Sequence, residues 1–390
     1  MEFKKYKMED IATFSQGKQV EIENQYTEQK ENMKRFLRII DFTNPNEPIR
    51  YVEDFGDRYY ATKEDLVMIR YGSQTCGKVV IGKEGIIANN MFKINLDNST
   101  VLNKYAYYYL KQDIVYNYLR GSQNSSTMPS INFGILNKLE IEVPSIDNQK
   151  KIIKILNDID QKIKLNNEIN NNLHDLAEQQ FNEIYSMGSP KKLDELLFSV
   201  STGSRPKGGA QESGIPSIGA EKIEKFGIYD YSSEKYISED FYEKLKNGKL
   251  NSGDVLLYKD GAYTGKVSMC LNGFPHNKAA VNEHVFILNT ENNWAQNYLY
   301  FVLYNKDNKE MLHRLACSKA AQPGLNQVEL KSIEINICAK DDILKFENSV
   351  KPIMEKIALN SLENKRLAEL RDTLLPKLMN SEIDLDNIEI

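Results

Sequence analysis

Residues 149–186 read QKKIIKILNDIDQKIKLNNEINNNLHDLAEQQFNEIYS, and the spacing of their apolar and amide side chains predicts how the chain folds. Steps of four and three residues alternate along the stretch through these positions: Ile152, Leu156, Ile159, Ile163, Asn166, Asn170, Leu173, Ala177, Gln180 and Ile184. Such spacing lines one face of a helix and is the seam of a coiled coil. The stretch therefore predicts a long helix that packs against a second helix.

A second copy of this seam occurs 194 residues further along the chain. Its positions are Phe346, Val350, Ile353, Ile357, Asn360, Asn364, Leu367, Arg371, Leu374 and Leu378. The asparagines straddle the middle of each seam, so an antiparallel pair of helices would place Asn166 against Asn364 and Asn170 against Asn360. Buried amides weaken a seam but penalise slipped registers. These four asparagines are therefore predicted to fix the register of the pair.

Two features of the helices leave alternatives open. Each helix could instead pack only on its own domain, with the asparagines facing solvent, because one sequence does not define a seam uniquely. In addition, Pro352 predicts a break or kink early in the second helix, since proline removes a backbone hydrogen bond.

The repeat continues upstream of the helices. Residues 129–132 and 323–326 fall on one another, and GSQTCGKV at 72–79 answers GAYTGKV at 261–267 with one residue fewer between the glycines. Glycine, four residues and then Gly77-Lys78 resembles a phosphate-binding loop, but no Ser or Thr follows the lysine and the next residues are β-branched. A phosphate cradle needs fixed spacing, whereas a hairpin tip tolerates the change. Both stretches are therefore predicted to be hairpin tips.

Two aromatic clusters also repeat, YAYYYL at 105–110 and YLYFVL at 298–303. Aromatic residues at helical spacing usually pack in a core, so both clusters are predicted to be buried helices. The alternative is that these rings stack on nucleic-acid bases.

The composition is that of a globular protein of 390 residues, long enough for two or three domains, with 41% hydrophobic and 27% charged residues. A net charge of −5 gives no global argument for nucleic-acid binding. The start, MEFKKYKMED, has no secretory signal, and no apolar run has the length of a membrane span, so the protein is expected to be cytoplasmic. The four cysteines form no CxxC pair, and His276 and His284 lack companion ligands, so neither a disulfide framework nor a metal site is expected.

Three longer stretches resemble a known family, the specificity subunits (HsdS) of type I restriction-modification systems. They are MPSINFGILNKLEIEVPSIDNQKKIIKIL at 128–156, QPGLNQVELKSIEINI at 322–337 and LRDTLLPKLMNSEI at 370–383, and STGSRPKGG at 201–209 followed by IPSIGAEKI opens the second half in the family manner. The resemblance covers essentially the whole chain.

The resemblance implies an α+β fold in which two similar target-recognition domains are linked by two long antiparallel coiled-coil helices, with an internal pseudo-two-fold repeat. The expected boundaries are a first recognition domain at 1–146, a first helix at 147–187, a second recognition domain at 188–339, a second helix at 340–380 and a tail at 381–390.

The resemblance also implies a non-catalytic reader of double-stranded DNA, in which each half reads one part of a gapped target and the helices set the gap. Two methyltransferase subunits would dock on the helices, and motor-nuclease subunits are a further partner. S-adenosylmethionine, ATP and magnesium are expected on those partners, with no cofactor in this chain, and no methylation motif occurs here; Asn44-Pro45-Asn46 comes nearest.

Polar and basic side chains on the predicted tips and loops are candidates for DNA contact, because lysine and arginine hold phosphates and side chains at tips reach base edges. The candidates are Arg70, Ser73, Gln74, Thr75, Lys78, Ser122, Gln123, Asn124, Arg205, Lys207, Lys259, Tyr263, Thr264, Lys266, Lys319 and Gln322. Each could also be an ordinary solvated surface residue.

Two other functions remain open from the sequence. One is a coiled-coil scaffold with protein-binding ends, which predicts no sequence-dependent DNA affinity. The other is a stand-alone nucleotide-binding enzyme, which predicts ATP binding that is lost in Lys78→Ala.

Overall fold

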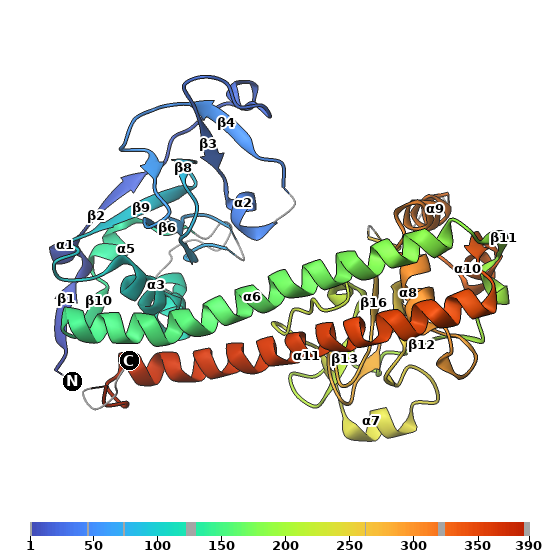
Figure 1. The fold of residues 1–390 in the computed structure, drawn as a ribbon. Helices are drawn as coiled ribbons and strands as arrows, with labels where there is room; N and C mark the ends of the chain where they lie inside the picture. Colours follow the sequence, from blue (N-terminus) through green and yellow to red (C-terminus); the bar gives the residue numbers. More distant parts are fainter. Residues whose placement is uncertain are drawn as a thin grey trace. The chain divides into compact units, whose positions relative to one another are not determined.

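The computed structural model describes residues 2–44, 47–72, 75–121, 130–261, 263–318 and 324–385. The chain divides into two compact units (Figure 1): unit 1 comprises Met1–Asp160 and Glu369–Ile390, and unit 2 comprises Gln161–Ala368. The long helices α6 (Ile146–Tyr185) and α11 (Lys340–Met379) each contribute to both units.

Unit 1 is built from short strands and helices. The strands are β1 (Lys4–Lys7), β2 (Ala12–Gln16), β3 (Met33–Leu37), β4 (Arg50–Glu53), β5 (Tyr60–Ala61), β6 (Leu66–Ile69), β7 (Val79–Val80), β8 (Gly85–Ile87), β9 (Met91–Leu96) and β10 (Glu140–Val143). Its helices, besides the long ones, are α1 (Met8–Ile11), α2 (Ile39–Thr43), α3 (Asn103–Lys111), α4 (Asp113–Gly121), α5 (Phe133–Asn137) and a 3-10 turn, η1 (Ile22–Asn24).

Unit 2 repeats the plan. Its strands are β11 (Ser189–Lys192), β12 (Ser199–Thr202), β13 (Ile215–Ile218), β14 (Tyr236–Ile237), β15 (Val255–Tyr258), β16 (Val267–Met269), β17 (Ala280–Val281), β18 (Val285–Asn289) and β19 (Glu334–Ile337). Its helices are α7 (Glu239–Lys244), α8 (Gln296–Tyr304), α9 (Lys306–Cys317), α10 (Gln327–Ser332) and the 3-10 turns η2 (Leu193–Glu195), η3 (Ala220–Lys222) and η4 (Glu291–Asn293).

Sheet order confirms the internal repeat. The central sheet runs β2-β9-β6-β7 in unit 1 and β12-β18-β15-β16 in unit 2. A smaller sheet, β4-β3-β8-β5 or β14-β13-β17, contains one parallel pair in each unit, β3 with β8 and β13 with β17. Two short strands close each unit, β1 with β10 and β11 with β19. The predicted fold class, two similar α+β domains with long antiparallel helices, is thus confirmed.

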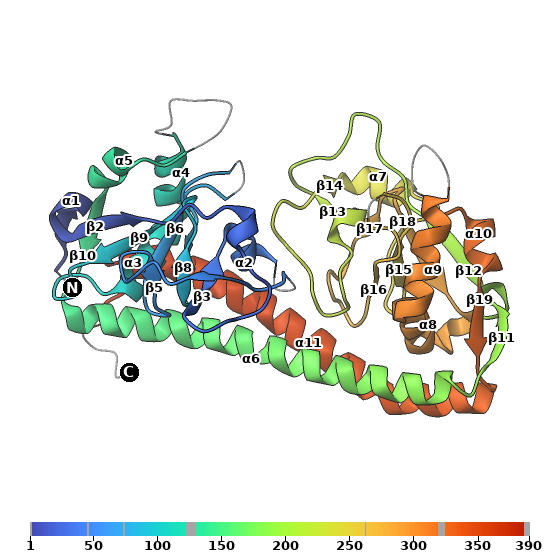
Figure 2. The ribbon, with the colours of Figure 1, turned by 90° about the horizontal axis from the view of Figure 1, so that it is seen from above.

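The central strands explain the layering, because alternate side chains of a strand point to opposite faces. In β15, Val255 and Leu257 join the core under α8, while Leu256 faces the cluster that contains Val281 of the smaller sheet. Figure 2 shows α8 and α9 beside the central strands of unit 2. The strand β6 of unit 1 divides its side chains in the same way. A continuous apolar run in the sequence therefore marks a strand that is covered on both faces.

Both aromatic clusters form buried helices, as predicted. Tyr105 in α3 and Tyr298 in α8 are fully buried. The Tyr105 hydroxyl donates to the Glu142 carbonyl at 2.7 Å, and the Tyr298 hydroxyl donates to the Asn336 carbonyl at 2.9 Å. Burial raises the pKa of both phenols above their ordinary value. These two rings serve the core and are not available to stack on bases.

The long helices run antiparallel, and the amides meet in the predicted pairs. Within unit 2, Asn166 Nδ2 donates to Asn364 Oδ1 at 2.9 Å, and Asn360 Nδ2 donates to Asn170 Oδ1 at 2.9 Å. All but Asn364 of these side chains are buried. The alternative of solvent-facing asparagines is therefore wrong for three of the four.

The expected break at Pro352 does not occur, because α11 is one helix from Lys340 to Met379. Pro352 and Asn348, whose carbonyl loses its helical partner, are both exposed. Water can satisfy that carbonyl on the exposed face, so the helix continues through the proline.

The long helices contact the aromatic helices α3 and α8 through different chemistry. In unit 1, Arg371 Nη1 donates to Asp160 Oδ1 at 2.8 Å, and the Tyr108 hydroxyl donates to Asp160 Oδ2 at 2.8 Å. The repeat-equivalent residues in unit 2 are Ala177, Met354 and Phe301, which belong to one buried apolar cluster. The two contacts are thus equivalent in position and opposite in polarity.

Within the described ranges, none of the helices combines the length and the apolar character that crossing a bilayer requires.

Candidate nucleic-acid interface

Each central sheet ends in the hairpin tip that the sequence predicts. Strands β6 and β7 pair antiparallel, as do β15 and β16. The amide of Gly77 donates to the Ile69 carbonyl at 2.9 Å, and the amide of Gly265 donates to the Tyr258 carbonyl at 2.9 Å. Both glycines have positive φ, 87° and 97°, which side chains rarely adopt. The lysine after each glycine enters a strand, so these loops lack the helix terminus that a phosphate cradle needs.

The chain returns to each tip after the helix that follows α3 or α8. Ser130 forms a β-bridge with Tyr71 in unit 1, and Gly324 forms one with Asp260 in unit 2. The polar stretches 122–129 and 319–323 precede these residues in the sequence. The candidates Ser122, Gln123, Asn124, Lys319 and Gln322 on these loops, and Ser73 and Gln74 on the first tip, lie outside the described residues.

A third segment reaches each site from the end of β2 or β12. Gly17 and Gly203 follow these strands, where a side chain would collide with the backbone of Ala88 or Val281. Two residues later, Gln19 accepts a hydrogen bond from Asn89 Nδ2, and Arg205 Nε donates to Glu283 at 3.1 Å. The two contacts occupy equivalent places in the repeat.

Gln19 and its neighbour Lys18 were not among the sequence candidates. The signal was present in the sequence, because Ser15-Gln16-Gly17 answers Ser201-Thr202-Gly203. The equivalence of the two segments becomes clear only in the structure, where Gly17 lies against Ala88 and Gly203 lies against Val281.

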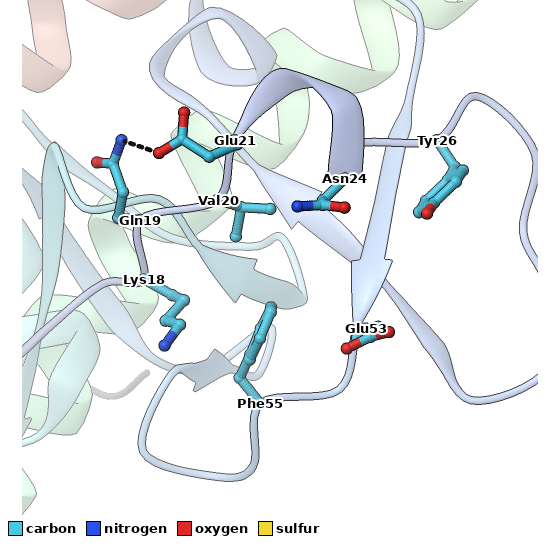
Figure 3. A pocket seen from close by; sticks show the side chains of 8 residues that line it. All are labelled: Lys18, Gln19, Val20, Glu21, Asn24, Tyr26, Glu53 and Phe55. Atoms are coloured by element: carbon cyan, nitrogen blue, oxygen red, sulfur yellow. Dashed lines mark hydrogen bonds between the residues drawn. The ribbon is translucent and has the colours of Figure 1, made fainter.

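Figure 3 shows the hollow that this segment borders in unit 1. It has a volume of about 290 Å³ and is lined by Lys18, Gln19, Val20, Glu21, Asn24, Tyr26, Glu53 and Phe55. Lys18 Nζ lies 5.0 Å from the centre of the Phe55 ring, and Gln19 Nε2 donates to Glu21 Oε1 at 3.4 Å. Amides and a cation beside apolar surface are the groups that contact base edges and phosphates.

The first tip carries three described candidates. The Arg70 guanidinium lies 5.0 Å from the centre of the Tyr71 ring, and its Nε is buried without a hydrogen-bond partner among the described residues. Thr75 is half-buried, and its hydroxyl donates to the Tyr71 carbonyl at 3.2 Å. Lys78 is exposed and has no ion pair with any residue described. Of the three, Lys78 is the side chain most open to a phosphate.

The basic candidates of unit 2 are mostly paired with acids. Lys259 Nζ lies 3.8 Å from Asp260, and Lys266 forms an ion pair with Glu224. Arg205 is held by Glu283, as described above. Lys207 is exposed and, in the described part of the chain, has no ion-pair partner. Three of these four cations must therefore leave an acid, or share it, to bind a phosphate.

The two remaining candidates of the second tip differ in accessibility. Tyr263 is 64% exposed, and Lys266 Nζ lies 4.8 Å from the centre of its ring. Thr264 is only 3% exposed, and its hydroxyl donates to the Gly261 carbonyl at 2.8 Å. The structure therefore argues against Thr264 as a DNA contact, because its only polar group closes the turn.

A basic hollow beside the second tip was missed by the sequence analysis. It has a volume of about 530 Å³, and its lining residues are Tyr263, Thr264, Lys266, Lys306, Lys309, Glu310, His313 and Arg314. Lys306, Lys309 and Arg314 have no ion-pair partner among residues 263–318 and the other described ranges. The helix α9 supplies these cations, and the glycine of the tip approaches it closely, since a side chain at Gly265 would lie 3.3 Å from the Lys309 carbonyl. Clustered unpaired cations of this kind bind phosphate oxygens.

Comparison with known proteins gives consistent results. Residues 1–175 match the family described as type I restriction modification DNA specificity domain. The chain is 25% identical to the MjaIX specificity subunit of a type I restriction enzyme from Methanocaldococcus jannaschii, over 80% of this chain and 76% of that protein. It is 22% identical to the HindI specificity subunit from Haemophilus influenzae, over 76% of this chain and 81% of that protein.

The fold is also shared with a solved structure. The crystal structure of a type I restriction-modification system S subunit from M. genitalium superposes with a TM-score of 0.56 at 18% identity, covering 97% of this chain and 96% of that one. The resemblance to type I restriction-modification specificity subunits that the repeated motifs indicate is thereby confirmed.

Proposed function

We propose that the chain reads a bipartite, gapped DNA target, with unit 1 contacting one part and unit 2 the other. The observation that carries this proposal is the duplicated site. In each unit, the hairpin tip forms a β-bridge with the returning chain at Ser130 or Gly324, and the segment after β2 or β12 makes an equivalent side-chain contact, Gln19 with Asn89 or Arg205 with Glu283. One duplex contacted by two such sites is read in two places.

The two sites differ in their side chains, which supports two different recognition elements. Gln19 opposite Asn89 in unit 1 is replaced by Arg205 opposite Glu283 in unit 2. Amides pair with adenine edges, whereas arginine pairs with guanine edges and carboxylates accept from cytosine. A target with two unlike components follows from these differences.

The paired helices fix the spacing between the components. The amide pairs Asn166–Asn364 and Asn170–Asn360, in which all but Asn364 are buried, hold one register, since a slip would leave amides against hydrocarbon. The unread gap in the target then has one length.

Repeated apolar residues on the helices provide docking positions for methyltransferase subunits. Leu165 and Leu359 are equivalent in the repeat and are 52% and 56% exposed, and the equivalent residues Leu176 and Leu370 are 46% and 48% exposed. Exposed leucines repeated at equivalent places on both helices are apolar surface that a partner would cover. Because both copies of the repeat carry them, the same partner binds twice, which gives two methyltransferase subunits for each chain. A motor-nuclease subunit joins that complex.

In this proposal the chain itself is non-catalytic. S-adenosylmethionine, ATP and magnesium are bound by the partner subunits, and the target adenine is flipped into the methyltransferase. A stand-alone nucleotide enzyme is disfavoured, because Lys78 and Lys266 lie on hairpin tips rather than at helix termini.

Single-molecule methylation mapping tests the proposal in cells that express the chain with its methyltransferase subunit. A gapped, two-part adenine motif should appear with the chain and vanish without it. Gln19→Ala should relax only one component of the motif, and Arg205→Ala only the other. A continuous motif, or one variant that alters both components, would overturn the bipartite proposal. Methylation that does not depend on the chain would favour a scaffold with protein-binding ends.

A further inference from the structure

A buried histidine of unit 2 has one ring nitrogen without a partner. His174 lies in α6 and is 1% exposed. Its Nε2 lies 2.9 Å from the Tyr300 hydroxyl, and its ring packs 4.7 Å from the centre of the Tyr304 ring. Its Nδ1 is buried and has no hydrogen-bond partner in the described part of the chain. A buried polar atom of this kind costs stability unless a ligand or water completes it.

Two carboxylates lie beside this nitrogen. Glu178, one helical turn on, places Oε2 at 3.8 Å from His174 Nδ1, which is beyond hydrogen-bond distance. Asp175 brings a further oxygen, and the three donor atoms lie within 4.8 Å of one another. The nitrogen and the two carboxylates therefore face a common point beside the helix.

The charge state of the cluster suits a cation. Burial, with a smaller contribution from the nearby Lys225 charge, lowers the pKa of His174 to about 3, which favours the neutral imidazole. Burial raises the pKa of Glu178, and the negative charge of Asp175 adds to that shift. A bound cation would relieve the repulsion between the two carboxylates.

We propose that His174 Nδ1, Asp175 and Glu178 form a binding site for one transition-metal dication of the Zn²⁺ type, with water completing the coordination. One nitrogen and two carboxylate oxygens are a donor set that zinc accepts. Metal–donor distances of about 2.0–2.2 Å require the donors to close to roughly 3.4 Å apart, given tetrahedral geometry. Rotation of the exposed Asp175 and half-buried Glu178 side chains supplies that movement.

The metal would also fix the tautomer of His174. Coordination at Nδ1 leaves the proton on Nε2, which then donates to the Tyr300 hydroxyl. That hydroxyl also accepts from the Phe226 amide at 3.2 Å. The site would therefore hold the loop at Lys225–Gly227 against α6 and α8. The sequence predicts no metal site, because its cysteines form no CxxC pair and His276 and His284 lack companion ligands.

Lys225 distinguishes a metal site from a chance cluster. Its Nζ donates to Asn171 Oδ1 at 2.9 Å, and its charge acts on both His174 and Glu178. A cation so placed weakens the binding of a second cation. Removal of the lysine charge must therefore raise metal affinity, while removal of a ligand must lower it.

The test uses the untagged full chain after chelation, with Zn²⁺ titrated by isothermal calorimetry. All variants carry His313→Ala and Cys317→Ser, because His313 Nε2 and Cys317 Sγ lie 3.5 Å apart and form a competing pair on α9. The expected result is one equivalent of Zn²⁺ and no binding of Mg²⁺, which prefers oxygen ligands. Glu178→Gln and Asp175→Asn should each weaken Zn²⁺ binding by about tenfold or more. Lys225→Gln should tighten it.

Substitution by Co²⁺ provides a second readout, because its visible absorption reports coordination by nitrogen and oxygen ligands. The absorption should be lost in Glu178→Gln, a variant whose half-buried side chain keeps its volume and does not threaten folding. Equal Zn²⁺ affinity in Glu178→Gln and its parent, or weaker binding in Lys225→Gln, would overturn the proposal.

Discussion

The guanidinium Nε of Arg205 lies 3.1 Å from a carboxylate oxygen of Glu283, so a cation at the second site is held by an acid of its own unit. The Arg205 and Glu283 side chains are 50% and 38% exposed, and ion pairs that solvent reaches contribute about 0.2–1 kcal/mol. DNA binding must compete with this pair. We therefore expect Glu283→Gln to raise the affinity of the assembled methyltransferase complex for DNA by about two- to fivefold. Fluorescence anisotropy with a labelled duplex measures the change.

The control is Glu195→Gln, which removes an acid that pairs with Lys191 and is 55% exposed, compared with 38% for Glu283. The control should leave the affinity unchanged. Unaltered or reduced affinity in Glu283→Gln would mean that Arg205 does not contact DNA.

The cations of α9 should govern the salt dependence of binding. Each phosphate contact contributes about 0.9 to the slope of log affinity against log salt concentration. Replacement of Lys306, Lys309 and Arg314 by glutamine should therefore reduce that slope by up to about 2.7, without a change in the methylated motif. Lys191→Gln is the control. An unchanged slope would exclude the basic hollow from the DNA interface.

The amide pair in the seam should show non-additive energetics. Asn170→Leu leaves the Asn360 amide, which donates to Asn170 at 2.9 Å, facing a hydrocarbon side chain. That change should lower the free energy of unfolding by about 1–3 kcal/mol. Adding Asn360→Leu should recover most of the loss, since no donor is then left unpaired. Urea denaturation of the full chain measures both effects, and the exposed Asn172→Ala should change little. If the losses in the free energy of unfolding caused by Asn170→Leu and Asn360→Leu simply added, the pairing of the two amides would be contradicted.

A buried carboxyl predicts a pH dependence of stability. Burial raises the pKa of Glu347 from 4.5 to about 7, although its carboxylate accepts from the Tyr298 amide and from Asn297 Nδ2. Because the folded-state pKa is the higher one, Glu347 contributes stability that is fully present below pH 4.5 and is lost as the pH rises through 7. Glu347→Gln should therefore gain stability relative to the natural chain between pH 5 and pH 8. Urea midpoints at several pH values measure the difference, and a constant difference would show that Glu347 does not titrate in this range.

The spacing role of the helices has a geometric test. Four residues inserted in both helices, after Asp160 and after Ala368, add about one turn or 6 Å. The insertions should lengthen the unread gap of the target by one or two base pairs at about 3.4 Å each. Methylation mapping reads the gap directly, and an insertion in the exposed turn at Gly208 should leave it unchanged. If an active complex with both insertions kept the original gap, the helices would not set the length of the gap.

The repeat made most of the fold predictable from the sequence. Two copies of each motif could be checked against one another, so the hairpin tips, the buried tyrosines and the antiparallel asparagine pairs were all foreseen. Pro352 was misjudged, because whether a proline ends a helix depends on which face it occupies, and the sequence pattern does not reveal the face.

The candidate site was less accessible to sequence reasoning. The cations of α9 face the second tip only through the packing of Gly265 on that helix, which no local pattern encodes. Thr264 looked exposed because it lies in a polar loop, yet its hydroxyl closes the turn. Lys266 and Arg205 pair with acids from distant segments of the sequence. These ion pairs exist only in the folded chain, so the sequence pattern does not show that the two cations are neutralised.

The contrast between the polar contact at Asp160 and the apolar one at Met354 limits how the two globular parts of the chain can be exchanged. A crossover that exchanged only the globular parts would bring Phe301 to Asp160 and Tyr108 to Met354. A carboxylate oxygen and a phenol hydroxyl would each lose their partner, at a cost of about 1–3 kcal/mol apiece. An exchange of the two globular parts is therefore tolerated best when Asp160 and Arg371 move together with Tyr108 as one block.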